Sequence, residues 1–144
     1  MRPFFTTDQP AYLAGVAPFV LRIATGVIFA AHGWQKLANG LNGTAGFLET
    51  LGFPVPMVFA ILLIAAELGG GILLILGLYT GFVARILALV SIIAWLTVHT
   101  GKGFFMASGG YEFIMLLFAA CISLAITGPG RWTLRSIVRR AQVS

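Results

Sequence analysis

The sequence predicts an all-α protein, a transmembrane four-helix bundle that forms a single membrane domain over residues 1–144. Two observations lead to this prediction. Of the 144 residues, 59% are hydrophobic and only 9% are charged, and the mean hydropathy is +0.99. A soluble domain carries roughly 25% charged residues, so the composition argues against a water-soluble fold. At ~20 apolar residues per crossing, the length allows four helices with short loops and no separate soluble domain.

The basic charge is concentrated at the C-terminal end. The net charge is +5, and four of the nine basic residues occur in the last fourteen positions. A basic segment directly after the final apolar run is typical of the cytoplasmic side of a membrane and of contact with anionic lipid. Membrane lipid is therefore an expected partner, and nucleic acid is not. The single cysteine, Cys121, excludes an intramolecular disulfide and a CxxC motif.

The first helix is expected at about residues 12–37. Its apolar stretch contains Arg22 and is too long for the apolar region of a signal peptide, so we expect it to remain in the mature protein. Small residues recur along this helix at i, i+4 and i+7, which lets another helix backbone approach closely. These residues are Gly26, Ala30 and Gly33.

The remaining segments are an interfacial stretch with a short helix at 39–53, helices at 54–77, 80–99 and 111–127, and a basic cytoplasmic tail at 131–144. The second helix begins at prolines, which the first turn tolerates. Its single charge, Glu67, is followed by three glycines that favour close contact with a neighbouring helix. Glu112 opens the fourth helix, where the helix dipole favours an acid.

The topology predicts a buried ion pair. The basic tail indicates a cytoplasmic C-terminus, and four crossings then place the N-terminus on the same side. At ~1.5 Å per residue, Arg22 and Glu67 each lie about 15 Å from the cytoplasmic end. Because either charge alone is costly in hydrocarbon, we predict that they pair. The pair either fixes the helix register or contacts a bound headgroup or quinone. Arg85, nearer the cytoplasmic end, competes for Glu67 or reaches lipid phosphate.

The other ionisable groups of the predicted spans gather toward the outer leaflet. Three helix ends contribute them, and a quinone needs such hydrogen-bond donors at its carbonyls together with an apolar slot for its tail. Histidine can also relay the protons that accompany quinone reduction. The candidate ligand-binding set is His32, Lys36, His99 and Glu112, flanked by Trp34 and Trp95.

Two other interpretations of this set stay open. Lysine, histidine and tryptophan are also ordinary residues of a membrane interface. His32 and His99 lie near one depth on helices that run in the same direction, which axial ligation of a haem requires. The sequence indicates no other metal site and no intrinsic electron carrier.

Five motifs follow one another along the chain. They are Arg22-x3-Gly26-x2-Phe29-x2-His32-Gly33-x2-Lys36, Glu67 with its glycine cluster, Gly77-Leu78-x-Thr80, Glu112, and Gly128-Pro129-Gly130. In this order they resemble the DoxX family of small four-helix membrane proteins, over roughly residues 15–135. The chain departs from the family twice. Thr133-Leu134-Arg135 stands where the family commonly has Ser-Leu-Asp, and Gly81 stands where the family has an arginine.

This resemblance implies a multi-pass protein of the cytoplasmic (inner) membrane of a prokaryote, linked to quinone-dependent oxidation and to thiol or oxidative stress. Similar proteins serve as a subunit of thiosulfate:quinone oxidoreductase. We therefore expect a membrane subunit that binds a quinone-like or other small amphipathic ligand near the outer leaflet, while a redox partner protein supplies the electrons. The alternative is a non-enzymatic small-molecule carrier or a membrane scaffold for a redox complex. The glycines at 69–71 would suit a homodimer equally well.

Overall fold

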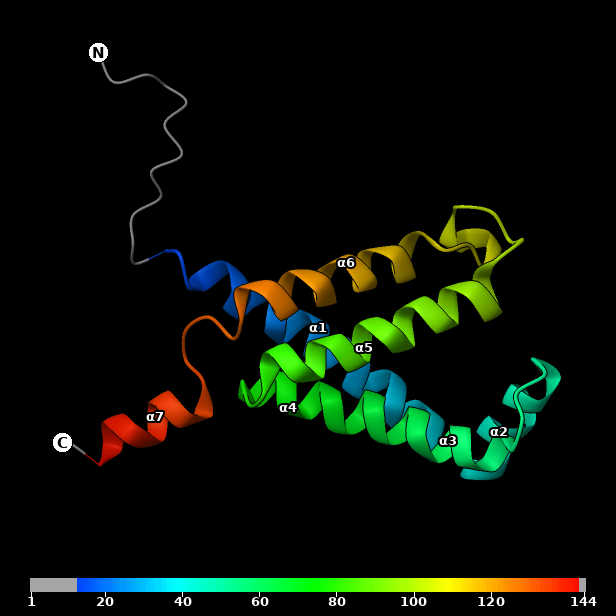
Figure 1. Cartoon of the computed structure of the whole chain (residues 1–144), viewed down its shortest axis with the longest axis horizontal. Coiled ribbons are helices and arrows are strands. Elements are labelled where there is room, and N and C mark those ends of the chain that lie inside the picture. The colour runs from blue at the N-terminus through cyan, green and yellow to red at the C-terminus, as the bar shows by residue number, and fades with distance from the viewer. Residues whose placement is uncertain (1–12, 143–144) are drawn as a thin grey trace, which may run out of the picture.

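The computed structural model describes residues 13–142 and is all-α over that range (Figure 1). Two of the long helices contain a π-helical turn, in which the chain is wound more widely than in an α-helix. The long helices are α1 (Val16–Ala38), α3 (Pro56–Ile64) continued by η1 (Ala65–Gly69) and α4 (Gly70–Leu76), α5 (Thr80–Ala94) continued by η2 (Trp95–His99), and α6 (Glu112–Thr127). The expected helix start at residue 12 lies outside the described residues.

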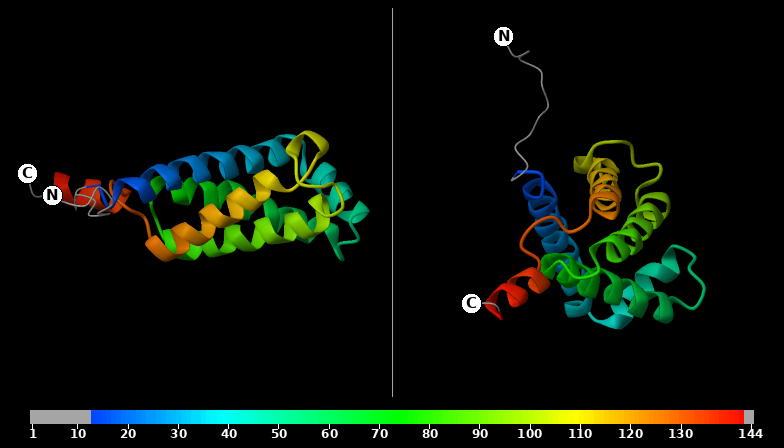
Figure 2. Two further views of the ribbon diagram at one scale, coloured as in Figure 1. Left: turned by 90° about the horizontal axis from the view of Figure 1, so that it is seen from above. Right: turned by 60° about the vertical axis from the view of Figure 1, so that its left-hand side comes forward.

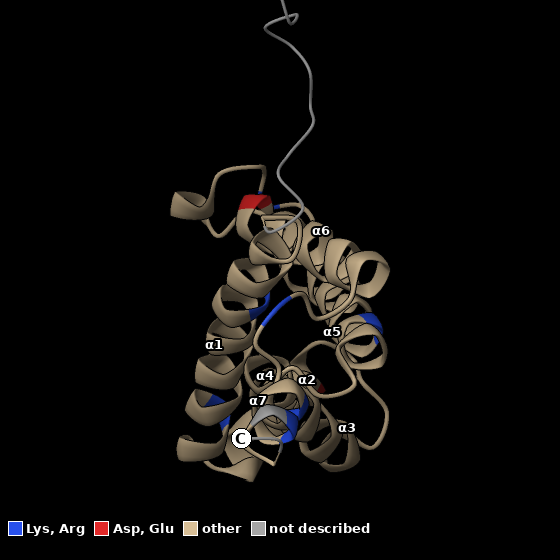
Figure 3. Cartoon of the chain, turned by 90° about the vertical axis from the view of Figure 1, so that its left-hand side faces the viewer, with Lys and Arg blue, Asp and Glu red and all other residues tan. Residues whose placement is uncertain are grey.

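Three of these helices are long and apolar enough to cross a membrane: Val16–Ala38, Pro56–Leu76 and Thr80–His99. The fourth, Glu112–Thr127, is apolar but shorter, with 16 residues. The chain is thus a multi-pass membrane protein, and the predicted bounds of the last three long helices agree with the structure to within two residues. The charged positions are few and isolated on a largely uncharged ribbon (Figure 3).

Two short helices lie at opposite ends of the bundle (Figures 1 and 2). Helix α2 (Leu41–Thr50) folds back and packs on α3, where Ala45 and Leu48 are buried with Ala60. This is the short helix expected at 39–53. Helix α7 (Leu134–Ala141) lies at the end where α1 begins, within the stretch that is predicted as a basic tail. We call these two ends the α2 end and the α7 end.

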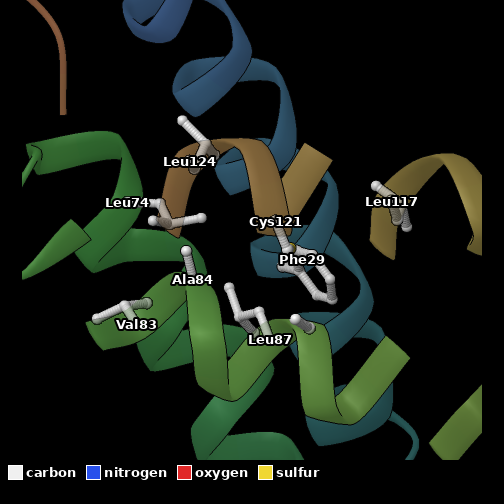
Figure 4. Close-up of a cluster of buried hydrophobic side chains, with 9 residues drawn as sticks. Phe29, Leu74, Val83, Ala84, Leu87, Leu117, Cys121 and Leu124 are labelled. Atoms are coloured by element: carbon white, nitrogen blue, oxygen red, sulfur yellow. The ribbon is translucent and has the colours of Figure 1, made fainter. Parts of the chain in front are cut away.

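The core is built from all four long helices (Figure 4). Phe29 of α1 packs with Leu74 of α4, Leu87 of α5 and Cys121 of α6, and each of these side chains is at most 3% exposed. Many other large apolar side chains stay exposed, as expected where the surroundings of a bundle are hydrocarbon rather than water.

Helices α1 and α4 pack backbone against backbone, as the spacing of small residues predicts. A Cβ atom placed on Gly71 would lie 2.7 Å from the carbonyl oxygen of Gly26 and 2.9 Å from the Cα of Ala30. A Cβ on Gly33 would meet the backbone of Leu68 in η1. Only glycine allows this separation, and it fixes which residues of the two helices face each other.

Candidate functional site

The inner face of α1 carries a basic residue toward each end, and the two occupy different environments. Arg22 lies toward the α7 end and Lys36 toward the α2 end. They share this face with Gly26, Phe29 and Gly33, which are all buried. Intramembrane charges of this kind are costly unless another group of the protein satisfies them, and they mark functional sites by default.

Lys36 forms an ion pair with Glu67. Its Nζ lies 2.6 Å from Oε2 of Glu67, and it donates a hydrogen bond to that oxygen. The Glu67 side chain is 9% exposed and the Lys36 side chain 25% exposed, so the carboxylate is shielded while the ammonium is partly accessible. A charge-assisted hydrogen bond of this length is among the stronger polar contacts in proteins.

Three local features bring this pair together. Glu67 lies in η1, where the wider π-helical winding interrupts the α-helical hydrogen bonding, a feature often found at functional sites. The glycine contact of Gly33 with Leu68 brings the two helices close one turn before Lys36. The hydroxyl of Thr44, on α2, donates to the carbonyl oxygen of Lys36 at 3.4 Å, so α2 lies against the end of α1 beside the pair.

Arg22 is fully buried and is bound by backbone carbonyl oxygens. Its Nη1 donates to the carbonyls of Leu74 and Ile75, each at 2.8 Å. Its Nη2 donates to those of Arg131 and Trp132, at 3.3 and 3.2 Å. The first two carbonyls belong to the last turn of α4, where helix carbonyls lack helical partners and the helix dipole attracts a cation.

The predicted ion pair between Arg22 and Glu67 is therefore wrong, since each residue has other partners. The depth estimate placed both residues about 15 Å from the cytoplasmic end. The glycine contact sets a different register from this depth estimate, because Gly26 faces Gly71. Helices α1 and α4 are antiparallel, so the residue four positions before Gly26 faces the residue four positions after Gly71. Arg22 thus lies opposite Ile75, and Glu67 lies further along α1, within reach of Lys36.

The C-terminal segment is attached to the start of α1 around Arg22. The amide of Arg131 donates to the carbonyl oxygen of Gly15 at 2.9 Å. The rings of Phe19 and Trp132 pack edge to face with centroids 4.8 Å apart. The Gly128-Pro129-Gly130 motif therefore turns the chain from α6 back onto α1, and the two residues after it, Arg131 and Trp132, supply two of the Arg22 acceptors.

Three residues of the predicted ligand-binding set instead hold the loop between η2 and α6. His99 Nδ1 donates to the carbonyl oxygen of Gly109 at 2.8 Å. The Glu112 carboxylate accepts the amide of Met106 at 2.6 Å. The Trp95 ring stacks on Tyr111 with centroids 5.1 Å apart. These contacts give each of the three residues an architectural role in this loop.

The two remaining members of the set lie on the outside of α1. His32 is exposed and has no hydrogen bond to another residue within 13–142, and Trp34 is 62% exposed. At ~100° per residue, His32 is about 80° from Arg22 around the helix, so it lies at the edge of the buried face. Arg22 and Lys36 therefore share the inner face of α1, and His32 does not. Ligand binding by the set stays a prediction.

The structure thus defines a class, a multi-pass α-helical membrane protein with an ion pair at the α2 end and a carbonyl-bound arginine at the α7 end. The sequence model of the DoxX family matches residues 17–100, and the chain belongs to this family. The predicted family resemblance is confirmed.

Three relatives illustrate the similarity. The chain is 38% identical to the putative oxidoreductase CatD of Bacillus subtilis over 113 residues, covering 78% of this chain and 80% of the relative. It is 34% identical to the inner membrane protein YphA of Escherichia coli over 120 residues, or 77% and 82% of the two chains. It is 27% identical to the inner membrane protein YqjF of Escherichia coli over 128 residues, or 89% and 96%. No solved structure matches the chain.

Proposed function

We propose that this protein is an inner-membrane subunit with four spans and both termini in the cytoplasm, as its relatives' names and its basic C-terminal segment suggest. Positively charged segments next to a span stay on the cytoplasmic side, and Arg135 and Arg139 on α7 follow this rule. The α7 end then faces the cytoplasm. The α2 end, with the Lys36–Glu67 pair, faces the outer leaflet.

We further propose that the Lys36–Glu67 pair is the binding site for a quinone-like ligand in a quinone-linked redox system. The single observation behind this is a close ion pair within the spans, with a shielded carboxylate and a partly accessible ammonium. Lys36 donates a hydrogen bond to one quinone carbonyl. Reduction to the quinol takes two electrons, which a redox partner protein supplies, and two protons, which reach the ligand from water by way of Glu67.

Two considerations support this choice of residues over the full predicted set. His99, Trp95 and Glu112 already have partners in the loop before α6, so their use by a ligand would cost that loop its contacts. The Lys36 ammonium has three N–H donors, so it can donate to a ligand carbonyl while it keeps its contact with Glu67. The name of CatD, a putative oxidoreductase, agrees with redox chemistry in this family.

The test is quinone binding to the purified protein in lipid nanodiscs, and quenching of tryptophan fluorescence measures the binding. Lys36→Met and Glu67→Gln should each weaken binding at least about tenfold, because each removes a charge-assisted contact. Lys102→Met, which removes an exposed lysine from the loop after η2, is the matched control and should bind as the wild type does. Unchanged binding by both pair variants would refute the site.

The same preparation distinguishes the redox subunit from the carrier or scaffold. A redox subunit should raise the rate of quinone reduction by its co-purified partner, and Glu67→Gln should lower that rate. A carrier should instead transport the small molecule into liposomes without any redox partner. Transport of this kind, with no effect on quinone reduction, would favour the carrier.

A further inference from the structure

An apolar groove runs along the outside of the bundle between the second and third long helices. Its volume is about 420 Å³. One wall is made by small and apolar residues of η1 and α4, and the other by the first turns of α5 with the residue before it. The lining residues are Ala65, Ala66, Gly69, Gly70, Leu73, Tyr79, Phe82, Val83 and Ile86. From Ala65 to Leu73 the groove follows the helix for about 12 Å.

The shape of the groove follows from the contrast between its walls. A Cβ atom placed on Gly69 would meet nothing within 4 Å, so the space beside this glycine is open. On the opposite wall, Tyr79 is 78% exposed and Phe82 is 64% exposed. Small residues on one helix and projecting rings on the next make an apolar slot between the two helices.

An unpaired charge on α5 lies next to residues that line the groove. Arg85 is exposed and has no ion pair or hydrogen bond with any residue that the structure describes. It follows Phe82 by one turn and precedes Ile86, and both of these line the groove. A guanidinium that faces hydrocarbon is costly unless it reaches a counter-charge. Five residues from the start of α5, or about 7.5 Å, its side chain can extend toward the headgroup level at the α7 end.

We propose that this groove binds an anionic glycerophospholipid. Its phosphate is bound by Arg85, the hydroxyl of Tyr79 lies at the mouth of the groove beside the headgroup, and one acyl chain lies in the slot along Gly69 and Gly70. The groove extends from the turn that carries Glu67 toward the α7 end, but neither Lys36 nor Glu67 lines it, so different residues test this site and the proposed quinone site.

Charge favours a lipid over a second copy of this chain as the occupant. A two-fold symmetric dimer through this face would bring the same surface of both copies together. Each copy would then add an unpaired Arg85 to one apolar interface, and like charges in such an interface repel. A lipid phosphate supplies the opposite charge instead.

The test is native mass spectrometry of the full chain, titrated with phosphatidylglycerol and with phosphatidylcholine. The wild type should bind the anionic lipid at least several-fold more tightly. Arg85→Gln should abolish this preference, whereas the control Lys102→Gln, which removes an exposed cation from the loop after η2, should keep it. Gly69→Leu should fill the slot and weaken binding of both lipids. Gly46→Leu, whose added side chain also enters open space, is its control.

The thermal midpoint of each variant establishes that it is folded, and Gly69→Ala replaces Gly69→Leu if the leucine variant fails this check. Wild-type binding of phosphatidylglycerol by both Arg85→Gln and the folded Gly69 variant would overturn the proposal. So would a wild-type dimer that Gly69→Leu converts to monomer without loss of bound lipid, because the groove would then be a contact between copies.

Discussion

The two ends of α1 satisfy a basic side chain in opposite ways. At the α7 end, Arg22 donates to four backbone carbonyls from two segments. At the α2 end, Lys36 faces the carboxylate of Glu67. Carbonyls that belong to the backbone neither take up protons nor turn away from their partner. A carboxylate does both, so the first arrangement suits permanent architecture and the second suits exchange with a ligand or a proton.

The largest loss of stability is expected from a substitution of Arg22, at the α7 end. Arg22→Met should lower the free energy of unfolding by roughly 3–5 kcal/mol, because buried carbonyls of α4 and of the C-terminal segment lose their donor. Reversible denaturation in mixed micelles measures this change. Arg139→Met, which removes an exposed arginine, should change the stability by less than about 0.5 kcal/mol. Equal losses in the two variants would mean that the carbonyl contacts carry no stability.

A smaller loss of stability is expected from substitutions in the Lys36–Glu67 pair, at the α2 end. Lys36→Met and Glu67→Gln should each cost about 1–3 kcal/mol, as expected for one charge-assisted hydrogen bond. The double variant should cost less than the two single losses together, with a coupling energy of about 1–2 kcal/mol. The same denaturation experiment gives all three values. Additive losses would show that the ion pair contributes nothing to the fold.

The smallest losses of stability are expected for the two histidines, and they should differ from each other. His99→Ala removes the contact with the Gly109 carbonyl and should cost about 1 kcal/mol. His32→Ala removes an exposed side chain without a partner in the described chain and should change the stability by no more than about 0.5 kcal/mol. Thermal midpoints of the two variants test this order. A greater loss for His32→Ala would indicate that this histidine has an interaction the structure does not contain.

The sequence predicts much of the fold because hydrocarbon restricts it. Long apolar runs that end at glycine or proline have few other ways to satisfy their backbone in a membrane, so the helix bounds follow. Small residues at Gly26, Ala30 and Gly33 likewise indicate the close contact that the structure contains. Helix α7 was not predicted, although the sequence contains a signal for it: apolar residues recur at i, i+3, i+4 and i+7, at Leu134, Ile137, Val138 and Ala141.

The charge partners were harder to predict. Carbonyl oxygens are present at every residue, so a sequence does not indicate that Arg22 binds them rather than a carboxylate. The partner of Glu67 depends on the register of two helices. The Gly26–Gly71 contact sets that register, and a shift of about one turn redirects a charge by about 5 Å. Depth counted from the helix ends is too coarse for this, and the π-helical turn at Glu67 has no sequence signal that we recognise.

The acceptors of Arg22 also impose an order on biosynthesis. The carbonyls of Leu74 and Ile75 are made 52 and 53 residues after the arginine, and those of Arg131 and Trp132 follow it by 109 and 110 residues. The first helix therefore leaves the ribosome carrying a cation whose ligands do not yet exist. Its contacts with the C-terminal segment can form only after the last loop has been translated. The set of Arg22 contacts is therefore complete only when the end of the chain is present.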